Sequence, residues 1–156
     1  MMLRRLVAVV LAFPLLRWLG QSEPKDGRAL LATSYERFQM GRYQDAIASF
    51  DRALAIRPRF ADAFLNRGNA LRNLKRYDEA IQFYKRSLDL GFSFPNGNAS
   101  ISYNIACCYA RLGEKEPAFK WLKKSMDMGF RNLGEMQTDA DLETLHDDPR
   151  FQQIAG

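Results

Sequence analysis

The sequence predicts an all-α fold assembled from repeated units, and two observations lead to that prediction. The first is an internal repeat: the segments 41–54 and 75–88 align, which places Tyr43 and Tyr77 34 residues apart. The second is the pattern inside the repeat, where tyrosine, alanine and an aromatic residue recur at the same offsets. A period of this length is typical of stacked units that share one core. The other matched pairs are Ala46 with Ala80 and Phe50 with Tyr84.

This pattern resembles the tetratricopeptide repeat (TPR), a family in which each repeat is a pair of antiparallel helices. The resemblance implies an antiparallel helix-hairpin solenoid of three TPR-type repeats with capping helices. The repeats are expected at about 27–60, 61–94 and 99–130, and a capping tail at 131–156 resembles the segment that closes many bacterial TPR arrays. In such a stack no hairpin buries its apolar face alone, so neighbours share a core.

Small residues recur where two helices of a hairpin would approach each other, and larger residues recur where space must be filled. We expect Ala80, in the second helix of its repeat, to pack against Gly68 in the first. The corresponding small residues are Ser34, Gly68 and Ala106 in first helices and Ala46, Ala80 and Ala118 in second helices, and Phe50, Tyr84 and Leu122 would fill the space between hairpins.

Three places depart from the regular pattern. The third repeat has a four-residue insertion, which falls in the turn-rich stretch 91–98, where Gly91 is a natural helix C-terminal cap. The first helix of the first repeat carries Thr33 and Arg37 where larger apolar residues are usual, so we interpret it as the polar end of the stack. In the tail, Asp148 before Pro149 predicts a helix start, and two short helices are expected to cover the last hairpin.

The N-terminal segment has the layout of a targeting signal. Residues 1–5 are short and basic, 6–16 are apolar, and small residues follow near Ser22. We expect residues 1–22 to be a signal peptide or an uncleaved signal anchor, which leaves 23–156 as the TPR domain. The protein would then be exported, periplasmic or anchored to the inner membrane facing outward. A mitochondrial presequence, and a hydrophobic first helix packed on a cytosolic protein, are the alternatives.

Charge and cysteine content exclude several functional classes. The net charge is +5, but three arginines lie in the acid-free first 22 residues, so the remainder carries 20 basic and 18 acidic residues, or +2. Such a body lacks the basic stripe that nucleic-acid binding needs. Cys107 and Cys108 are adjacent and form no disulfide framework, and with a single histidine, His146, they do not make a zinc site.

The resemblance also indicates where a partner would bind. In TPR proteins the first helices line a concave groove, and carrying the family's inward positions onto this chain selects a largely polar set. Asn66 and Asn104 occupy equivalent positions, and an asparagine side chain both donates and accepts hydrogen bonds, as a peptide backbone requires. The alternative is that asparagine is simply common at that position in the family. The predicted groove residues are Tyr35, Gln39, Asn66, Asn69, Arg72, Asn73, Tyr103, Asn104 and Arg111, with Arg28, Leu31 and Cys107 at further inward positions.

The groove does not carry the complete carboxylate clamp found in some TPR domains. Asn66 matches that clamp, but Leu31, Tyr35, Ser100 and Asn104 stand where its other basic and polar residues would be. Arg28, Arg72 and Arg111 would give either a mild preference for acidic ligands or ordinary solvated surface. The aspartates of the tail lack the spacing of a calcium loop and are interpreted as solvated helix caps: Asp139, Asp141, Asp147 and Asp148.

The sequence therefore predicts a protein–protein interaction scaffold or assembly factor that binds an extended peptide or partner protein in the groove. A structural module that self-associates without a peptide ligand is the alternative. With no glycine-rich phosphate loop, nucleophile elbow or metal cluster, no enzymatic activity, cofactor or metal is expected. A homo-oligomer and membrane attachment through residues 1–22 remain open.

Overall fold

The computed structural model of the protein describes residues 26–91 and 96–155, and this part of the chain is helical with no β-strand. Six long helices form three consecutive antiparallel pairs, which confirms the predicted all-α hairpin solenoid. The pairs are α2 (Gly27–Gln39) with α3 (Tyr43–Ile56), α4 (Ala61–Asn73) with α5 (Tyr77–Leu90), and α6 (Gly97–Arg111) with α7 (Lys115–Asp127).

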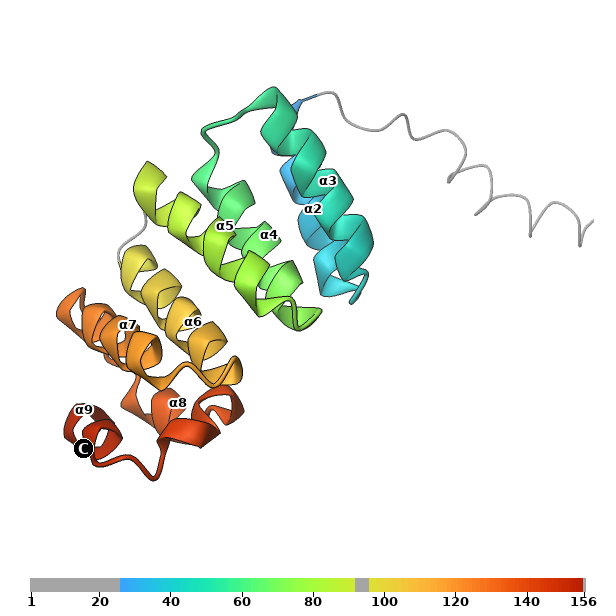
Figure 1. Cartoon of the computed structure of the whole chain (residues 1–156). Coiled ribbons are helices and arrows are strands. Elements are labelled where there is room, and N and C mark those ends of the chain that lie inside the picture. Colours follow the sequence, from blue (N-terminus) through green and yellow to red (C-terminus); the bar gives the residue numbers. More distant parts are fainter. Residues whose placement is uncertain (1–25, 92–95, 156) are drawn as a thin grey trace, which may run out of the picture.

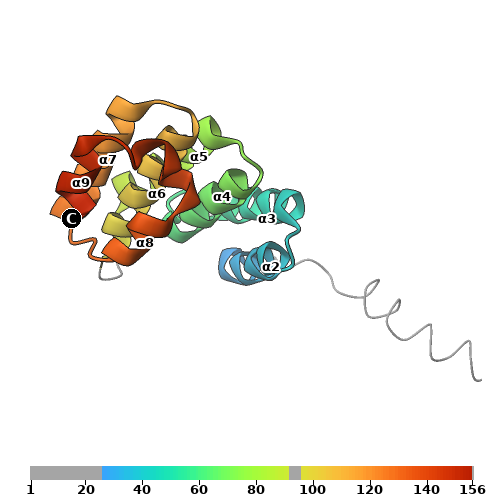
Figure 2. The same cartoon turned by 90° about the horizontal axis from the view of Figure 1, so that it is seen from below.

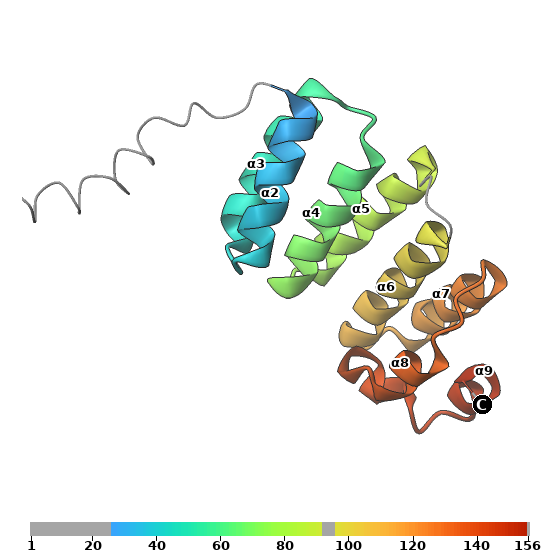
Figure 3. The same cartoon turned by 180° about the vertical axis from the view of Figure 1, so that it is seen from behind.

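The six helices form two layers. Figures 1 and 3 view the protein from opposite sides: α3 and α5 lie nearer the viewer in one, and α2 and α4 in the other. Each hairpin packs on the next one along the chain, through the contacts of α3 with α4 and of α5 with α6. We call the surface formed by α2, α4 and α6 the inner face, because it carries the residues predicted to line the groove.

Small residues bring the two helices of each hairpin close together, as predicted. Ala46, Ala80 and Ala118 are fully buried, and Phe50, Tyr84 and Leu122 fill the core around them. The side chain nearest to Gly68 is that of Tyr84, which we did not expect: a Cβ added at Gly68 would lie 2.7 Å from Cε1 of the Tyr84 ring. The tyrosine ring therefore occupies the space that the missing side chain leaves.

The turn inside each hairpin has the same backbone geometry in all three pairs. Gly41, Lys75 and Gly113 follow α2, α4 and α6 respectively, and each has a positive φ, of 72°, 60° and 78°. Glycine adopts this left-handed conformation without strain, whereas Lys75 does so at some cost. The predicted cap at Gly91 is also present, with φ of 77° at the C-terminal end of α5.

The C-terminal tail folds into three short helices instead of the expected two. They are α8 (Leu133–Thr138), the 3₁₀-helix η1 (Ala140–Leu145) and α9 (Pro149–Ala155). They lie against α6 and α7, at the end of the stack opposite α2 and α3 (Figures 1 and 2). Their apolar side chains complete the core of the last hairpin, namely Met136, Leu142, Leu145 and Phe151, each at most 2% exposed.

The predicted signal or anchor at 1–22 lies outside the described residues. Among the residues that the structure describes, no helix has the length and apolar character needed to cross a membrane.

Candidate functional site

The first helix of the inner face, α2, presents its predicted residues to solvent. Tyr35 is 49% exposed, and its ring stacks on Phe38 with 6.4 Å between the ring centroids. Gln39 and Arg28 are exposed, and Leu31 is partly buried against the core of the first two hairpins. This end of the inner face therefore offers an accessible aromatic ring beside polar side chains.

Asn66 of α4 and Asn104 of α6 are each half-buried and each use one end of the amide within the chain. The Nδ2 of Asn66 donates to the carbonyl oxygen of Asp62 at 2.9 Å, and the Oδ1 of Asn104 accepts from Arg72 Nη1 at 2.8 Å. Neither amide is therefore wholly available to a ligand. Within the described residues, the Oδ1 of Asn66 and the Nδ2 of Asn104 have no partner, which leaves one acceptor and one donor.

Two further asparagines of α4 support the helix and its neighbour. The Oδ1 of Asn69 accepts a hydrogen bond from the Tyr84 hydroxyl at 2.8 Å, so Asn69 orients the ring that packs on Gly68. Asn73 is exposed, and its Nδ2 donates to the Asn69 carbonyl oxygen at 2.9 Å. Burial raises the pKa of the Tyr84 phenol far above its ordinary value, so this hydroxyl stays protonated and remains a donor.

The tail covers the part of the inner face that α6 contributes. Tyr103 is only 3% exposed: its ring stacks on Phe130 with 4.4 Å between centroids, and its hydroxyl donates to Asp139 Oδ2 at 2.8 Å. Cys107 is fully buried, with its Sγ 3.6 Å from the same carboxylate oxygen. The prediction that Tyr103 and Cys107 lie open in a groove is wrong, because η1 packs on α6 at this position.

An aspartate of η1 also engages the two arginines of the inner face. Asp141 lies 3.8 Å from Arg72 Nε and 3.7 Å from Arg111 Nε, and Arg111 donates in addition to the Tyr77 hydroxyl at 3.2 Å. The side chains of Arg72 and Arg111 keep 30% and 39% of their exposure. Their positive charges are thus partly neutralised inside the chain but are not hidden from solvent.

Cys107, Asp139 and Asp141 form a compact group whose possible ligand atoms lie within 4.8 Å of one another. Metal ligands must be deprotonated. Burial, followed by the nearby Asp139 carboxylate, raises the pKa of the Cys107 thiol well above its ordinary value. Asp139 already accepts from Tyr103, and Asp141 faces two arginines. The arrangement is therefore that of a hydrogen-bonded network joining the tail to α6, and its donor set does not suit a cation.

The sequence did not predict that these residues join the tail to α6. Asp139 does cap a helix, since its Oδ1 accepts from the Asp141 amide at 2.9 Å, as we predicted for these aspartates. Its contacts with Tyr103 and Cys107 span 36 and 32 residues, however, and lie outside the repeat period. The four closely spaced aspartates were the available signal, and they gave no indication of their partners.

Two family models described as "Tetratricopeptide repeat" match the chain, one over residues 31–97 and the other over residues 99–128. Among curated proteins, the chain is 28% identical over 79 residues to a chloroplastic protein of Arabidopsis thaliana. It is 30% identical over 77 residues to the Protein SGT1 homolog of Oryza sativa subsp. japonica. The matches cover 51% and 49% of this chain but only 23% and 20% of those proteins.

Solved structures with the same fold include the N-terminal domain of stress-induced protein-1 from C. elegans, with a TM-score of 0.66 and 12% identity, covering 83% of this chain and 94% of that one. YrrB, whose structure is described as a TPR protein with an unusual peptide-binding site, has a TM-score of 0.66 and 16% identity, covering 83% and 64%. The Yersinia enterocolitica type III secretion translocator chaperone SycD has a TM-score of 0.62 and 18% identity, covering 82% and 90%. With the repeats matched along most of the described helices, this chain belongs to the tetratricopeptide-repeat family.

Proposed function

We propose that the protein is an interaction scaffold whose inner face binds an extended segment of a partner protein. The observation that carries the proposal is the pair of half-used amides, the Oδ1 of Asn66 on α4 and the Nδ2 of Asn104 on the next first helix, α6. An extended backbone presents N–H and C=O groups in turn, so it offers a donor to Asn66 and an acceptor to Asn104.

The surroundings of these amides suit a peptide ligand. Tyr35 and Gln39 are accessible on α2, and Asn73 is accessible at the end of α4. A tyrosine buries a large area with little loss of conformational entropy, which makes it an effective contact for a side chain of the ligand. Neutral amides bind the ligand backbone, and Tyr35 contacts its side chains. We therefore expect the inner face to bind peptide segments of varied sequence, without requiring a particular pattern of charges.

The relatives support the same class of function. YrrB is described as having a peptide-binding site, and SycD as a chaperone. The chain spans about a quarter or less of the curated relatives that it matches, so the activities of those whole proteins are not carried over.

Site-specific crosslinking followed by affinity measurement tests the proposal. A photo-crosslinking amino acid at Gln39 should capture a partner in cells, whereas the same group at Gln44, exposed on α3, should not. The captured partner is then titrated against the Asn66→Ala/Asn104→Ala variant. Because each lost neutral hydrogen bond costs about 0.5–1.5 kcal/mol, affinity should fall by about fivefold to a hundredfold.

The matched control replaces two exposed glutamines on α3 and α5, helices that do not form the inner face, in the variant Gln44→Ala/Gln82→Ala. It should bind the partner like the parent. Alanine favours helix, so neither variant should lose stability through helix propensity. Parental affinity in the Asn66→Ala/Asn104→Ala variant would refute backbone recognition by these amides.

A self-associating module is the second candidate, favoured by one observation. Tyr35 and Met40, at 49% and 72% exposure, lie on and next to α2, whose hairpin forms one end of the stack. Analytical ultracentrifugation distinguishes the two: a dimer that dissociates in a Tyr35→Ser/Met40→Ser variant, with unchanged partner binding, would favour self-association.

We further propose that residues 1–22 direct the protein across a membrane, from the basic and apolar pattern of that segment. Fractionation of cells into cytosol, membrane and exported fractions tests this, and cytosolic protein that retains residues 1–22 would contradict it.

A further inference from the structure

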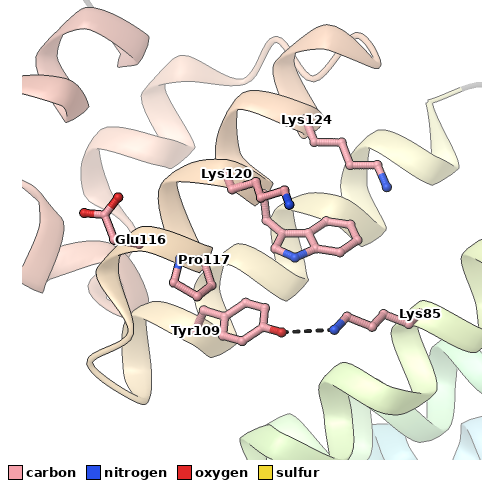
Figure 4. Close-up of a pocket in the computed structure, with 7 residues that line it drawn as sticks. Lys85, Tyr109, Glu116, Pro117, Lys120 and Lys124 are labelled. Atoms are coloured by element: carbon pink, nitrogen blue, oxygen red, sulfur yellow. Dashed lines mark hydrogen bonds between the residues drawn. The ribbon is translucent and has the colours of Figure 1, made fainter.

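A second concave feature lies away from the inner face. A cavity of about 690 Å³ is formed where α5, α6 and α7 meet, with Lys85 from α5, Tyr109 from α6 and the face of α7 from Glu116 to Lys124 around it (Figure 4). None of the residues predicted to bind a partner on the inner face lines this cavity. The cavity therefore requires an explanation of its own.

The walls of the cavity combine aromatic rings with amines. The Nζ of Lys85 donates to the Tyr109 hydroxyl at 3.0 Å, as Figure 4 shows, and lies 5.9 Å from the centre of the Trp121 ring. The Nζ of Lys124 lies 4.3 Å from the same ring centre. The tryptophan is half-buried, so part of its surface remains accessible to a ligand.

The lysines around the cavity lack carboxylate partners. Within the part of the chain that the structure describes, no ion pair involves Lys85, Lys120 or Lys124. The acid in the lining, Glu116, shares Arg150 with Asp148, at 2.7 and 2.8 Å, so this group of three carries one net negative charge against the three amines. Three amines beside exposed aromatic surface create a positive potential that favours an anionic ligand with an apolar part.

We propose that this cavity binds an acidic segment of a partner protein, one that places an aspartate or glutamate between Lys85 and Lys124 and an adjacent apolar side chain on Trp121. The positive charges of the lysines make an acidic ligand preferred over a neutral or basic one, and the aromatic rings provide apolar area for the ligand to bury. A nucleic acid is disfavoured because three lysines neutralise few phosphates and the rest of the domain is close to neutral.

Tryptophan fluorescence reports on the site directly. The chain has two tryptophans, Trp18 and Trp121, so a Trp18→Phe background leaves Trp121 as the only source of tryptophan emission. The probe is the acetylated peptide Asp-Glu-Leu-Asp-Glu-Phe, and its comparison is the same peptide with asparagine and glutamine in place of the acids. We expect the acidic peptide to shift the Trp121 emission saturably at about 50 mM salt, and the neutral peptide to bind at least about tenfold more weakly.

Adjacent lysines on α7 provide a matched pair of variants. Lys124→Gln removes a cavity amine and should weaken the acidic peptide about twofold to fivefold. Lys123→Gln removes the same charge one residue away, where Lys123 pairs with Asp127 at 3.4 Å, and should leave the affinity unchanged. Both are surface changes, and a thermal melt of each variant checks that the fold is retained.

Three outcomes would overturn the proposal. They are equal binding of the acidic and neutral peptides, equal effects of Lys124→Gln and Lys123→Gln, and tighter binding of a short oligodeoxythymidylate than of the acidic peptide. The Asn66→Ala/Asn104→Ala variant should bind the peptide normally, so failure of the inner-face proposal is distinguishable from failure of this one.

Discussion

The ring of Tyr84 lies directly on Gly68, so close that a Cβ on residue 68 would be 2.7 Å from Cε1 and 2.8 Å from Cδ1 of the ring. Tyr84 is fully buried and its hydroxyl is held by Asn69, so the ring has little freedom to move away. Because Gly68 has no side chain, the ring of Tyr84 on α5 packs directly against the backbone of α4.

This contact predicts that Gly68→Ala destabilises the protein relative to a helical glycine with free space. Gly134 in α8 is the control, because its nearest neighbouring atom would be 4.0 Å from an added Cβ. Both substitutions gain helix propensity, of about 0.5–1 kcal/mol. Only Gly68→Ala overpacks the core, so its free energy of unfolding in urea should be lower than that of Gly134→Ala by about 1–3 kcal/mol. Equal stabilities would show that the Tyr84 ring yields freely.

Burial of a charge at Ala80 should disrupt the stack. Ala80 is fully buried between helices, so Ala80→Asp places a carboxylate in an apolar core without a partner, at a cost of several kcal/mol. Ala48→Asp adds the same charge at an exposed position of α3 and should lower the melting temperature only slightly, through helix propensity. Circular dichroism melts of the two variants test this, and a parental melting temperature for Ala80→Asp would contradict the burial described here.

The hydrogen bond from Tyr103 to Asp139 should hold the tail on α6. Tyr103→Phe removes the hydroxyl and keeps the stacking on Phe130. Because the acceptor is charged but only half-buried, we expect a loss of about 1–2 kcal/mol in the free energy of unfolding at neutral pH. Tyr35→Phe, at an exposed tyrosine, should cost nothing measurable. Urea unfolding followed by circular dichroism measures both, and equal values would mean that the bond contributes no net stability.

The two thiols should be unreactive in the folded protein. Cys107 and Cys108 are fully buried, and burial raises the pKa of Cys108 to about 12 and that of Cys107 well above its usual range. Because only the thiolate reacts, labelling by a thiol reagent at about pH 8 should be slowed on the order of a thousandfold relative to a free cysteine. Ser100→Cys, at an exposed position of α6, should label rapidly, and both native thiols should label in urea. Rapid native labelling at either would contradict their burial.

The repeat period predicted the core but not the surface of the last repeat. Tyr43 and Tyr77, with the buried alanines, recur because hairpin packing imposes the same constraint in each unit. The repeat pattern also assigned Tyr103 to an inward position on its first helix, yet Asp139 and Phe130 cover this residue. Asp139 lies in the tail, which has no counterpart in the other repeats, and Phe130 is the last residue before it, so a repeat-based argument contains no information about these partners.

The sequence likewise could not predict which hydrogen bonds the inward asparagines make. Equivalent register placed Asn66 and Asn104 on the same face, but their bonds depend on local geometry. Asn66 reaches back to Asp62 in its own helix, whereas Asn104 accepts from Arg72 on the preceding hairpin. Which end of each amide stays available follows from those contacts and not from the residue type.

The position of Asp141 between Arg72 and Arg111 has a consequence for ligand selectivity. An acidic side chain arriving at these guanidinium groups meets a carboxylate already in place, so binding there is an exchange reaction in which one ion pair replaces another. The desolvation cost of the incoming acid is then offset by little new attraction. The chain's own tail thus offsets one of the two positive charges, and any preference of the inner face for acidic ligands is expected to be weak.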